Sequence, residues 1–248
     1  DDLHQKVSQF VKSRDPNLKL MGLRILSMTP LYVEEFQDTI IDSLEDDDPT
    51  IRRQTLDLLY TMANEANSQA IIVSMLKYFQ KSKDEAIADK IAIIATQYSP
   101  TAVWFAKSIE QLFLVGGDVI KPEVGQSLLR MVATDADDDM RREIVDLYVD
   151  VANQRNLSDV FVTVIANIIA NYGELSAEYD LPYLTFIMCD LADLYPGARM
   201  SVLNSIFIIS GKLENIPQEV IDIFENYKFS SDPMVQELCV EALSVLNH

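Results

Sequence analysis

Histidine and cysteine, the side chains that most often act as nucleophiles or hold metals, are scarce in this sequence. Its 248 residues include two His, His4 and His248, which lie near opposite ends without a Cys or carboxylate at ligand spacing. A zinc site and a Ser-His or Cys-His nucleophile are therefore disfavoured. Cys189 and Cys239 stand far apart in apolar helical contexts, which predicts buried thiols in a reducing compartment. We expect a protein that is not an enzyme, with no catalytic, cofactor-binding or metal-binding residues and no cofactor.

Glycine and proline are also few, at seven and nine copies. A chain built from many tight β-turns normally needs more, so an all-β fold is disfavoured. There is no G-x-G-x-x-G and no P-loop, and Gly116-Gly117 is interpreted as a helix stop. The acidic runs Glu45–Asp48 and Asp135–Asp139 lack the alternating ligands and central Gly of an EF-hand loop. We interpret each run as a solvated turn that leads into a helix N-cap.

Basic residues are outnumbered, with 20 Lys and Arg against 39 Asp and Glu, for a net charge of −19. Nucleic acid is not expected as a partner, because binding it requires Lys and Arg against the phosphates. Direct docking on anionic lipid is disfavoured for the same reason. The longest charge-free runs, Ile91–Ala106 and Val160–Gly173, are shorter than the roughly 20 apolar residues of a membrane span. These features predict a soluble, cytosolic protein.

Apolar residues, in contrast, make up 48% of the chain and recur at helical spacing. The segment Ser43–Asn64 shows the pattern: Asp48 can act as an N-cap, and Pro49 suits the first helical position, where its missing N–H costs nothing. The apolar side chains that follow lie on more than one side of the helix. One stripe contains Ile51, Leu58, Leu59 and Met62, and Leu56, Tyr60 and Ala63 lie beside it. Such a helix needs neighbours to cover it.

The same pattern recurs along the chain, and we expect about fourteen helices. They are predicted at Leu3–Lys12, Asp15–Leu26, Tyr32–Leu44, from Asp48, Ala70–Gln80, Asp84–Tyr98, Trp104–Val115, from Pro122, Met140–Ala152, Val160–Tyr172, Leu181–Tyr195, Arg199–Lys212, Pro217–Tyr227 and Pro233–Leu246. Val160–Tyr172, which is apolar nearly all round, should be the most buried of them.

Acidic helix starts recur at intervals of 33 residues (15 to 48) and 36 residues (48 to 84), with further ones near Asp139 and Asp232. Two helices per unit at such a period are typical of HEAT or armadillo repeats, which usually run ~40–47 residues. We therefore predict an all-α fold, a right-handed α-α superhelix. Residues 1–248 should form a single solenoid segment, which we interpret as a fragment of a longer chain. Arrays of this kind usually present extended surfaces to other proteins.

Two arginine pairs, Arg52-Arg53 and Arg141-Arg142, fall in first helical turns, where the helix dipole disfavours cations. Local ion pairs with the preceding acidic residues can offset this cost. Contact with an acidic partner is the alternative. Trp104 and Phe105 are interpreted as core between helices.

Two blocks of residues resemble a known family. Leu18-Lys19-Leu20-Met21-Gly22-Leu23-Arg24, with Ile40–Leu44 and the Asp-Pro-Thr-Ile-Arg-Arg-Gln-Thr-Leu-Asp-Leu-Leu-Tyr run after it, resembles the trunk of a large adaptin subunit. Tyr98–Phe105, running on to Val115–Ile120, is most similar to the epsilon type and less so to the gamma, alpha or delta types. The likeness covers roughly Asp15–Val132; beyond it only helical repeats continue.

The resemblance implies a large subunit of a heterotetrameric adaptor complex, which selects cargo and builds coats on membranes in vesicle-mediated transport. The span resembles the middle and later trunk; the amino-terminal trunk, hinge and appendage are expected to lie outside it. The implied partners are a beta-type large subunit and medium and small subunits. Membrane association would be indirect, through the assembled complex, and the implied location is cytoplasmic and peripheral on Golgi or endosomal membranes.

Another acidic helical-repeat protein, such as a karyopherin-like nuclear transport receptor, is the alternative. It rests only on the repeat pattern and the charge.

Overall fold

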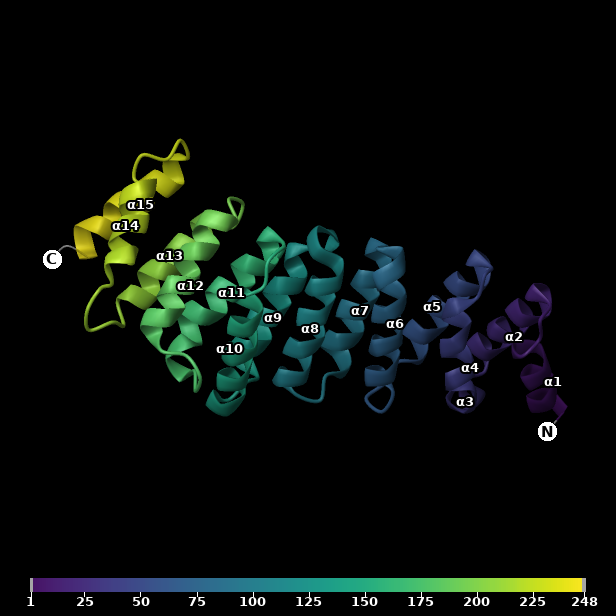
Figure 1. The fold of residues 1–248 in the computed structure, drawn as a ribbon. Coiled ribbons are helices and arrows are strands. Elements are labelled where there is room, and N and C mark those ends of the chain that lie inside the picture. The colour runs from purple at the N-terminus through teal and green to yellow at the C-terminus, as the bar shows by residue number, and fades with distance from the viewer. Residues whose placement is uncertain (1, 247–248) are drawn as a thin grey trace. The chain divides into compact units, whose positions relative to one another are not determined.

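The computed structural model describes residues 2–246, in which there are fifteen α-helices, four short 3-10 helices and no strand. The predicted all-α class is confirmed. Each of the fourteen predicted segments corresponds to one α-helix, except Tyr32–Leu44, which forms two. The helices fall into two compact units that divide between Pro100 and Thr101 (Figure 1).

The first unit contains three successive helical layers. Its elements are α1 (Asp2–Val11), α2 (Pro16–Met28), α3 (Pro30–Val33), η1 (Glu34–Phe36), α4 (Gln37–Asp42), η2 (Ser43–Glu45), α5 (Pro49–Met62), α6 (Ser68–Ser82) and α7 (Glu85–Tyr98). Helix α2 packs against α1 and α5, and α7 packs against α6 and α5. Helices α2, α5 and α7 therefore form one row, in which each helix is backed by the element that precedes it.

The second unit has two parallel rows. Its elements are α8 (Ala102–Gly116), η3 (Gly117–Val119), α9 (Pro122–Thr134), α10 (Asp138–Ala152), α11 (Asp159–Tyr172), η4 (Gly173–Leu175), α12 (Leu181–Leu194), α13 (Arg199–Ser210), α14 (Gln218–Tyr227) and α15 (Pro233–Leu246). Helices α8, α10, α12 and α14 contact one another in sequence and form the first row. Helices α9, α11, α13 and α15 do the same and form the second row. This two-row stacking is the arrangement expected of helical repeats.

The predicted helix starts are capped by carboxylates. Asp15, Asp48 and Asp232 accept hydrogen bonds from backbone N–H groups two residues on, at 2.8, 2.7 and 2.9 Å. Asp84 caps α7 in the same way at 2.9 Å. In the second acidic turn the cap is Asp137, which accepts from the N–H of Met140 at 2.8 Å, so α10 begins slightly before the predicted start. Each cap satisfies a donor that the helix itself leaves free.

The segment Tyr32–Leu44 is not the single helix that its periodicity predicts. Four elements, α3, η1, α4 and η2, occupy it. Val33, Phe36, Ile40 and Leu44 are nevertheless all buried. The first two lie three residues apart, and a 3-10 turn with three residues per turn places both side chains on the same face. Packing of these side chains thus selects the tighter turn.

The core of each unit is formed by the predicted apolar stripes. In α5, Ile51, Leu58 and Leu59 are fully buried, while Met62 is only half-buried. Helix α11 has eight buried residues among its 14, but α8 has nine among its 15. Over the predicted span Val160–Tyr172 the same eight are among 13 residues, a slightly larger share than in α8, so these two are the most buried of the described helices.

None of the described helices combines the length and the apolar character needed to cross a membrane.

Leu59→Ala should lower the free energy of unfolding by about 2–5 kcal/mol, because it removes a side chain with no exposed surface and leaves a cavity. Urea denaturation followed by circular dichroism measures the change. Leu31→Ala is the control, since Leu31 is 91% exposed and should change stability by less than about 0.5 kcal/mol. Equal effects of the two substitutions would contradict the assigned core.

Candidate functional site

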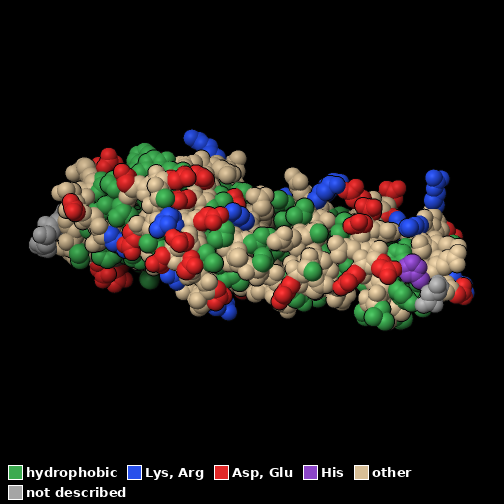
Figure 2. Space-filling view, turned by 90° about the horizontal axis from the view of Figure 1, so that it is seen from below, with side chains coloured by type: hydrophobic (Ala, Val, Ile, Leu, Met, Phe, Trp, Pro, Cys, Tyr) green, Lys and Arg blue, Asp and Glu red, His purple; other side chains and the backbone are tan. Residues whose placement is uncertain are grey.

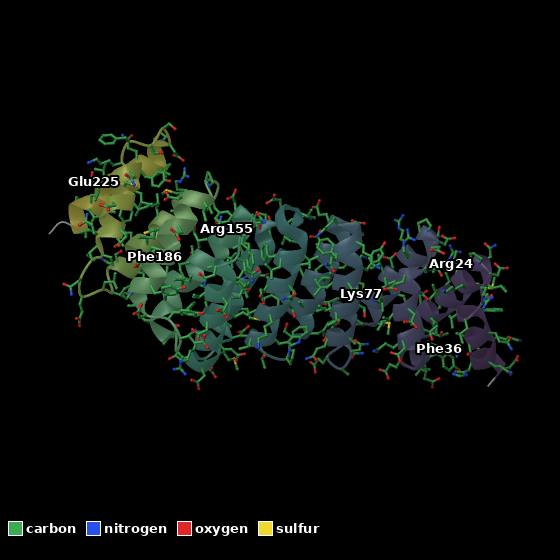
Figure 3. The ribbon with its side chains drawn as sticks, viewed as in Figure 1. Arg24, Phe36, Lys77, Arg155, Phe186 and Glu225 are labelled. Carbon is green, nitrogen blue, oxygen red and sulfur yellow. The ribbon has the colours of Figure 1, made fainter. Side chains whose placement is uncertain are left out.

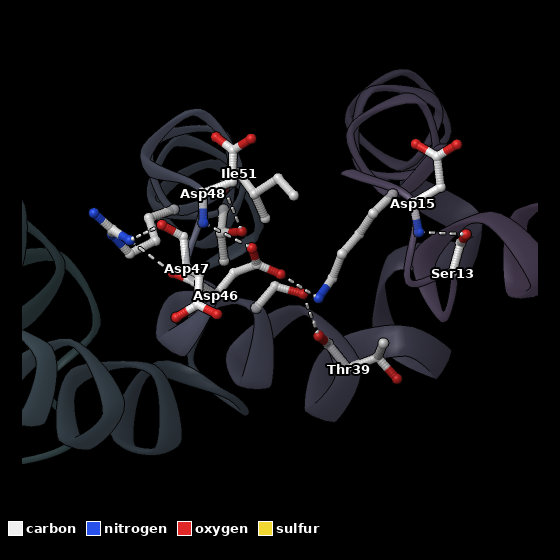
Figure 4. A network of polar contacts seen from close by, with 11 residues as sticks. Ser13, Asp15, Thr39, Asp46, Asp47, Asp48 and Ile51 are labelled. Atoms are coloured by element: carbon white, nitrogen blue, oxygen red, sulfur yellow. Dashed lines mark hydrogen bonds and ion pairs between the residues drawn. The ribbon is translucent and has the colours of Figure 1, made fainter. Parts of the chain in front are cut away.

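The first acidic turn, between η2 and α5, is held by a network around Asp46 (Figure 4). Its Oδ2 receives a hydrogen bond from Lys19 Nζ at 2.6 Å, and its Oδ1 receives one from the N–H of Asp48 at 3.0 Å. Burial alone would raise the pKa of Asp46, but the hydrogen bonds from Lys19 and Asp48, with the charges of Lys19 and Arg52, outweigh it and lower that pKa. Both oxygens are thus already used in joining α2 to the start of α5.

An open groove of about 690 Å³ lies beside this turn. Lys77 on α6, labelled in Figure 3, pairs with Glu45 at 2.7 Å, and Lys81 approaches the same carboxylate at 4.0 Å. The hydrogen bond from Lys77 is the main reason that the pKa of Glu45 is lowered. All three side chains are more than half exposed, so these ion pairs are screened by solvent and contribute little to stability. Among residues 2–246, no group of three or more His, Cys, Asp or Glu is placed to hold a metal ion.

The first-turn arginines donate to backbone carbonyls that precede their own helix, in the acidic turn for Arg52 and in the last turn of α9 for Arg141. Arg52 donates from Nη1 to the carbonyl oxygens of Asp46 and Asp47, at 2.7 and 2.8 Å. Arg141 donates from Nε to Val132 O at 3.2 Å and from Nη2 to Ala133 O at 2.9 Å. The last carbonyls of a helix have no partner within it and carry its negative dipole end. A cation at the start of one helix is therefore favourable because it lies at the end of another.

The same contact recurs at α13, where the sequence pattern did not reveal it. Arg199 donates from Nε to Ala192 O of α12 at 2.9 Å, and its guanidinium lies over the ring of Tyr227 at 4.5 Å. Arg141 lies over Tyr172 in a similar way, at 5.1 Å. The signal in the sequence is an Arg in the first turn of a helix that closely follows the end of another.

The remaining arginines of the two pairs differ. Arg142 donates to Leu175 O at 3.1 Å and pairs with Asp139 at 2.9 Å. Arg53 is exposed and makes no hydrogen bond or ion pair within the described residues. Arg141 also pairs with Asp138 at 3.1 Å, so the predicted ion pairs with preceding acidic residues are confirmed for Arg141 and Arg142. Contact with an acidic partner stays the alternative for Arg53.

The other residues considered from the sequence are spread over the two units. His4 lies against Glu35, with Nε2 and a carboxylate oxygen 2.6 Å apart, and touches the rings of Tyr32 and Phe36. His248 lies outside the described residues. Phe105 is fully buried, as predicted, while Trp104 is half-buried.

Both cysteines are buried free thiols, which confirms the prediction of burial. Burial, with Asp190, Asp193 and Glu219 nearby, raises the pKa of Cys189 to about 12. Burial raises the pKa of Cys239 to about 11. At neutral pH both are neutral thiols, which are poor nucleophiles.

Glu110 on α8 is a buried carboxylic acid whose surroundings disfavour its ionised form. Burial raises its pKa, the nearby Asp150 adds to the rise, and Gln111 and Lys107 oppose it. Tyr148 lies close to it and is fully buried, with its hydroxyl donating to Ala106 O at 3.0 Å. These polar groups join α10 to α8 and offer no arrangement of nucleophile and base.

The geometry thus describes a helical-repeat protein in which several charged groups, among them Asp46, Arg141 and Arg199, join one helix to the next. Residues 2–248 match the family of the Adaptin N terminal region. The chain therefore belongs to the adaptin family.

The relatives agree with this assignment. The chain is 29% identical over 264 residues to the AP-4 complex subunit epsilon of Arabidopsis thaliana, which covers 97% of this chain and 28% of that protein. It is 36% identical over 150 residues to the AP-4 complex subunit epsilon-1 of Homo sapiens, covering 57% of this chain and 13% of that protein. The AP-2 complex subunit alpha-2 of Arabidopsis thaliana is 25% identical over 252 residues, covering 95% of this chain and 25% of that protein. The predicted resemblance to epsilon-type large adaptins, with the alpha type less similar, is confirmed.

The fold is shared with a homology model of the full-length AP-3 complex in an intermediate open conformation. The TM-score is 0.74 at 18% identity, over 98% of this chain and 51% of that chain. This likeness confirms the helical solenoid. The chain spans 28% or less of the length of the three curated relatives described above.

Arg141→Lys should destabilise the protein by about 1–2 kcal/mol, because lysine keeps the charge but loses the planar fork that reaches Val132 O and Ala133 O. The midpoint of urea unfolding measures the loss. Arg53→Lys is the control and should shift stability by no more than about 0.5 kcal/mol. Equal shifts for the two variants would show that capping by Arg141 is unimportant.

Glu110→Gln should raise the melting temperature at pH 7. Because the folded pKa of Glu110 is raised, its ionised form disfavours folding above that pKa, and the cost disappears below the unfolded pKa of about 4.3. The gain should therefore shrink as the pH falls towards 4. Calorimetry from pH 4 to 7 checks this, with the exposed Glu214→Gln as the matched variant. A gain of the same size at every pH would contradict it.

Proposed function

We propose that this chain is part of the large subunit of a heterotetrameric adaptor complex, of the epsilon type, and that it acts as a non-catalytic scaffold in vesicle-mediated protein transport. The observation that carries the proposal is the family match over residues 2–248, together with an AP-4 epsilon relative that aligns over 97% of the chain. The partners would be a beta-type large subunit, a medium subunit and a small subunit.

The chemistry of the chain supports a scaffold. Asp46, Arg141 and Arg199 are engaged in joining helices, and both thiols are buried and neutral. Rows of stacked helices also present extended outer surfaces, which suit binding to other proteins.

Membrane association would be indirect, through the assembled complex. The net charge of −19 would repel an anionic membrane surface. The protein would be cytoplasmic, and peripheral on Golgi or endosomal membranes when assembled into a coat.

The test is affinity purification of the full-length protein from its own cells. We expect one beta-type large adaptin, one medium subunit and one small subunit in equal amounts, identified by mass spectrometry. A tagged protein of similar size and charge serves as the control bait. Recovery of none of the three subunits would overturn the proposal.

A further inference from the structure

Helix α12 leaves an apolar stripe uncovered on its outer side. Tyr183, Phe186 and Leu194 are 40%, 51% and 57% exposed, and Asp190 lies between them at helical spacing. Figure 3 labels Phe186 on this helix. Exposed apolar residues are ordinary when scattered, but a stripe along one helix face indicates a docking surface.

Tyr183, at one end of the stripe, is held in place before anything binds to it. Tyr179 stacks on Tyr183 with ring centroids 5.4 Å apart and planes 16° from parallel. The hydroxyl of Tyr179 donates to Asp150 on α10 at 2.6 Å. On the other side, Tyr227 of α14 donates to Asp193 at 2.6 Å. Rings fixed in this way lose little conformational entropy on binding.

Carboxylates that form no ion pair lie on α12 and on its two neighbours in the row, α10 and α14. Asp150 and Asp193 accept from tyrosine hydroxyls, Asp146 accepts from Ser176, and Asp222 accepts from Gln218. Within residues 2–246, neither these four nor Asp190 forms an ion pair with Lys, Arg or His. The nearby cations are already engaged, as in Lys107 with Glu143 and Lys228 with Glu225. In the view of Figure 2, acidic side chains outnumber basic ones over the part of the chain near its carboxyl terminus.

The second row of this unit also carries exposed apolar side chains: α15 exposes Met234, Val240 and Val245, with Glu237 and Glu241 exposed on the same helix. Helix α12 differs in that its exposed apolar side chains include two aromatic rings, those of Tyr183 and Phe186.

The pKa values of three groups near the first row are raised, and neighbouring carboxylates contribute to each rise. The hydrogen bond to Asp150, followed by burial and the charge of Asp150, raises the pKa of Tyr179 to about 12. Burial is the main cause of the raised pKa of Cys189, and Asp190, Asp193 and Glu219 add to it. Burial also dominates for Glu110, to which Asp150 contributes.

We propose that the stripe Tyr183, Phe186 and Leu194 docks a protein segment in which Lys or Arg alternates with apolar residues. The ring faces of Tyr183 and Phe186 can receive a cation, the carboxylates provide complementary charge, and Leu194 extends the apolar contact. A second copy of this chain fits poorly, because it would present the same acidic row. The inference concerns this chain alone and is tested without other adaptor subunits, so its failure is distinct from failure of the proposed function.

The probe is a labelled peptide of about 15 residues in which Lys and Arg alternate with Leu, long enough to span the exposed face of one helix. Binding to the 248-residue chain is followed by fluorescence anisotropy. We expect binding that weakens as salt rises, since part of it is electrostatic. Phe186→Ala should weaken binding about tenfold, as expected for an aromatic anchor, and Asp190→Asn several-fold. Both residues are exposed, and circular dichroism verifies that the variants fold.

Matched variants separate this surface from the general acidity of the protein. Ile208→Ala removes an apolar side chain that is 41% exposed on α13, and Asp135→Asn removes an exposed carboxylate after α9. Both should bind the probe as the unchanged chain does. The inference is overturned if Ile208→Ala weakens binding as much as Phe186→Ala, or Asp135→Asn as much as Asp190→Asn. It is overturned as well if a peptide with Glu in place of every Lys and Arg binds equally well, or if the probe does not bind at low salt. It is also overturned if light scattering shows a dimer that Phe186→Ala dissociates.

Discussion

The constraint on which this structure depends is that its helices bury their apolar surface only against other helices of the same stack. Helix α11 shows the constraint most clearly: α9, α10 and α13 all pack against it, and its Phe161 stacks on Phe113 with centroids 4.6 Å apart. Close approach also limits side-chain size. A Cβ at Gly22 would lie 2.8 Å from the backbone N of Val11, so only glycine lets α2 come this near to α1. Stability in such a stack is a sum over neighbouring layers, and each layer needs the next.

Stacking brings helix ends together as well as helix faces, and this explains the distribution of charge. Carboxylates at helix starts cap free N–H groups, whereas Arg141 and Arg199 donate to carbonyls in the last turns of the helices before them. A first-turn arginine, which is unfavourable in an isolated helix, becomes favourable once the preceding helix ends beside it. The surplus of 39 Asp and Glu over 20 Lys and Arg nevertheless leaves the chain with a net charge of −19.

Much of the fold and little of the surface could be predicted from the sequence. Periodicity and the Asp-Pro starts located the helices, because caps and apolar spacing are local properties of the chain. The break within Tyr32–Leu44 was missed, since it depends on how Val33 and Phe36 pack against other segments. The ion pairs of Arg141 and Arg142 with preceding aspartates were predicted and are confirmed. The hydrogen bonds of the arginines to backbone carbonyls were missed, because carbonyls of other segments leave no local signal in the sequence. The sequence predicted no arrangement of nucleophile, base or metal ligands and so did not point to a site. The network around Asp46 and the contacts of the arginines are visible only in the structure.

The sequence by itself determined the all-α class, the position of nearly every helix and membership of the adaptin family, because each follows from short runs of neighbouring residues. Only the tertiary structure decided which apolar residues are covered. Leu59 and Phe186 both lie at helical spacing among apolar neighbours, yet one is fully buried and the other half exposed. The physical reason is that a helix apolar on several sides has no single preferred face. Its partners in the stack select the face that is buried, and what they leave uncovered is available for binding.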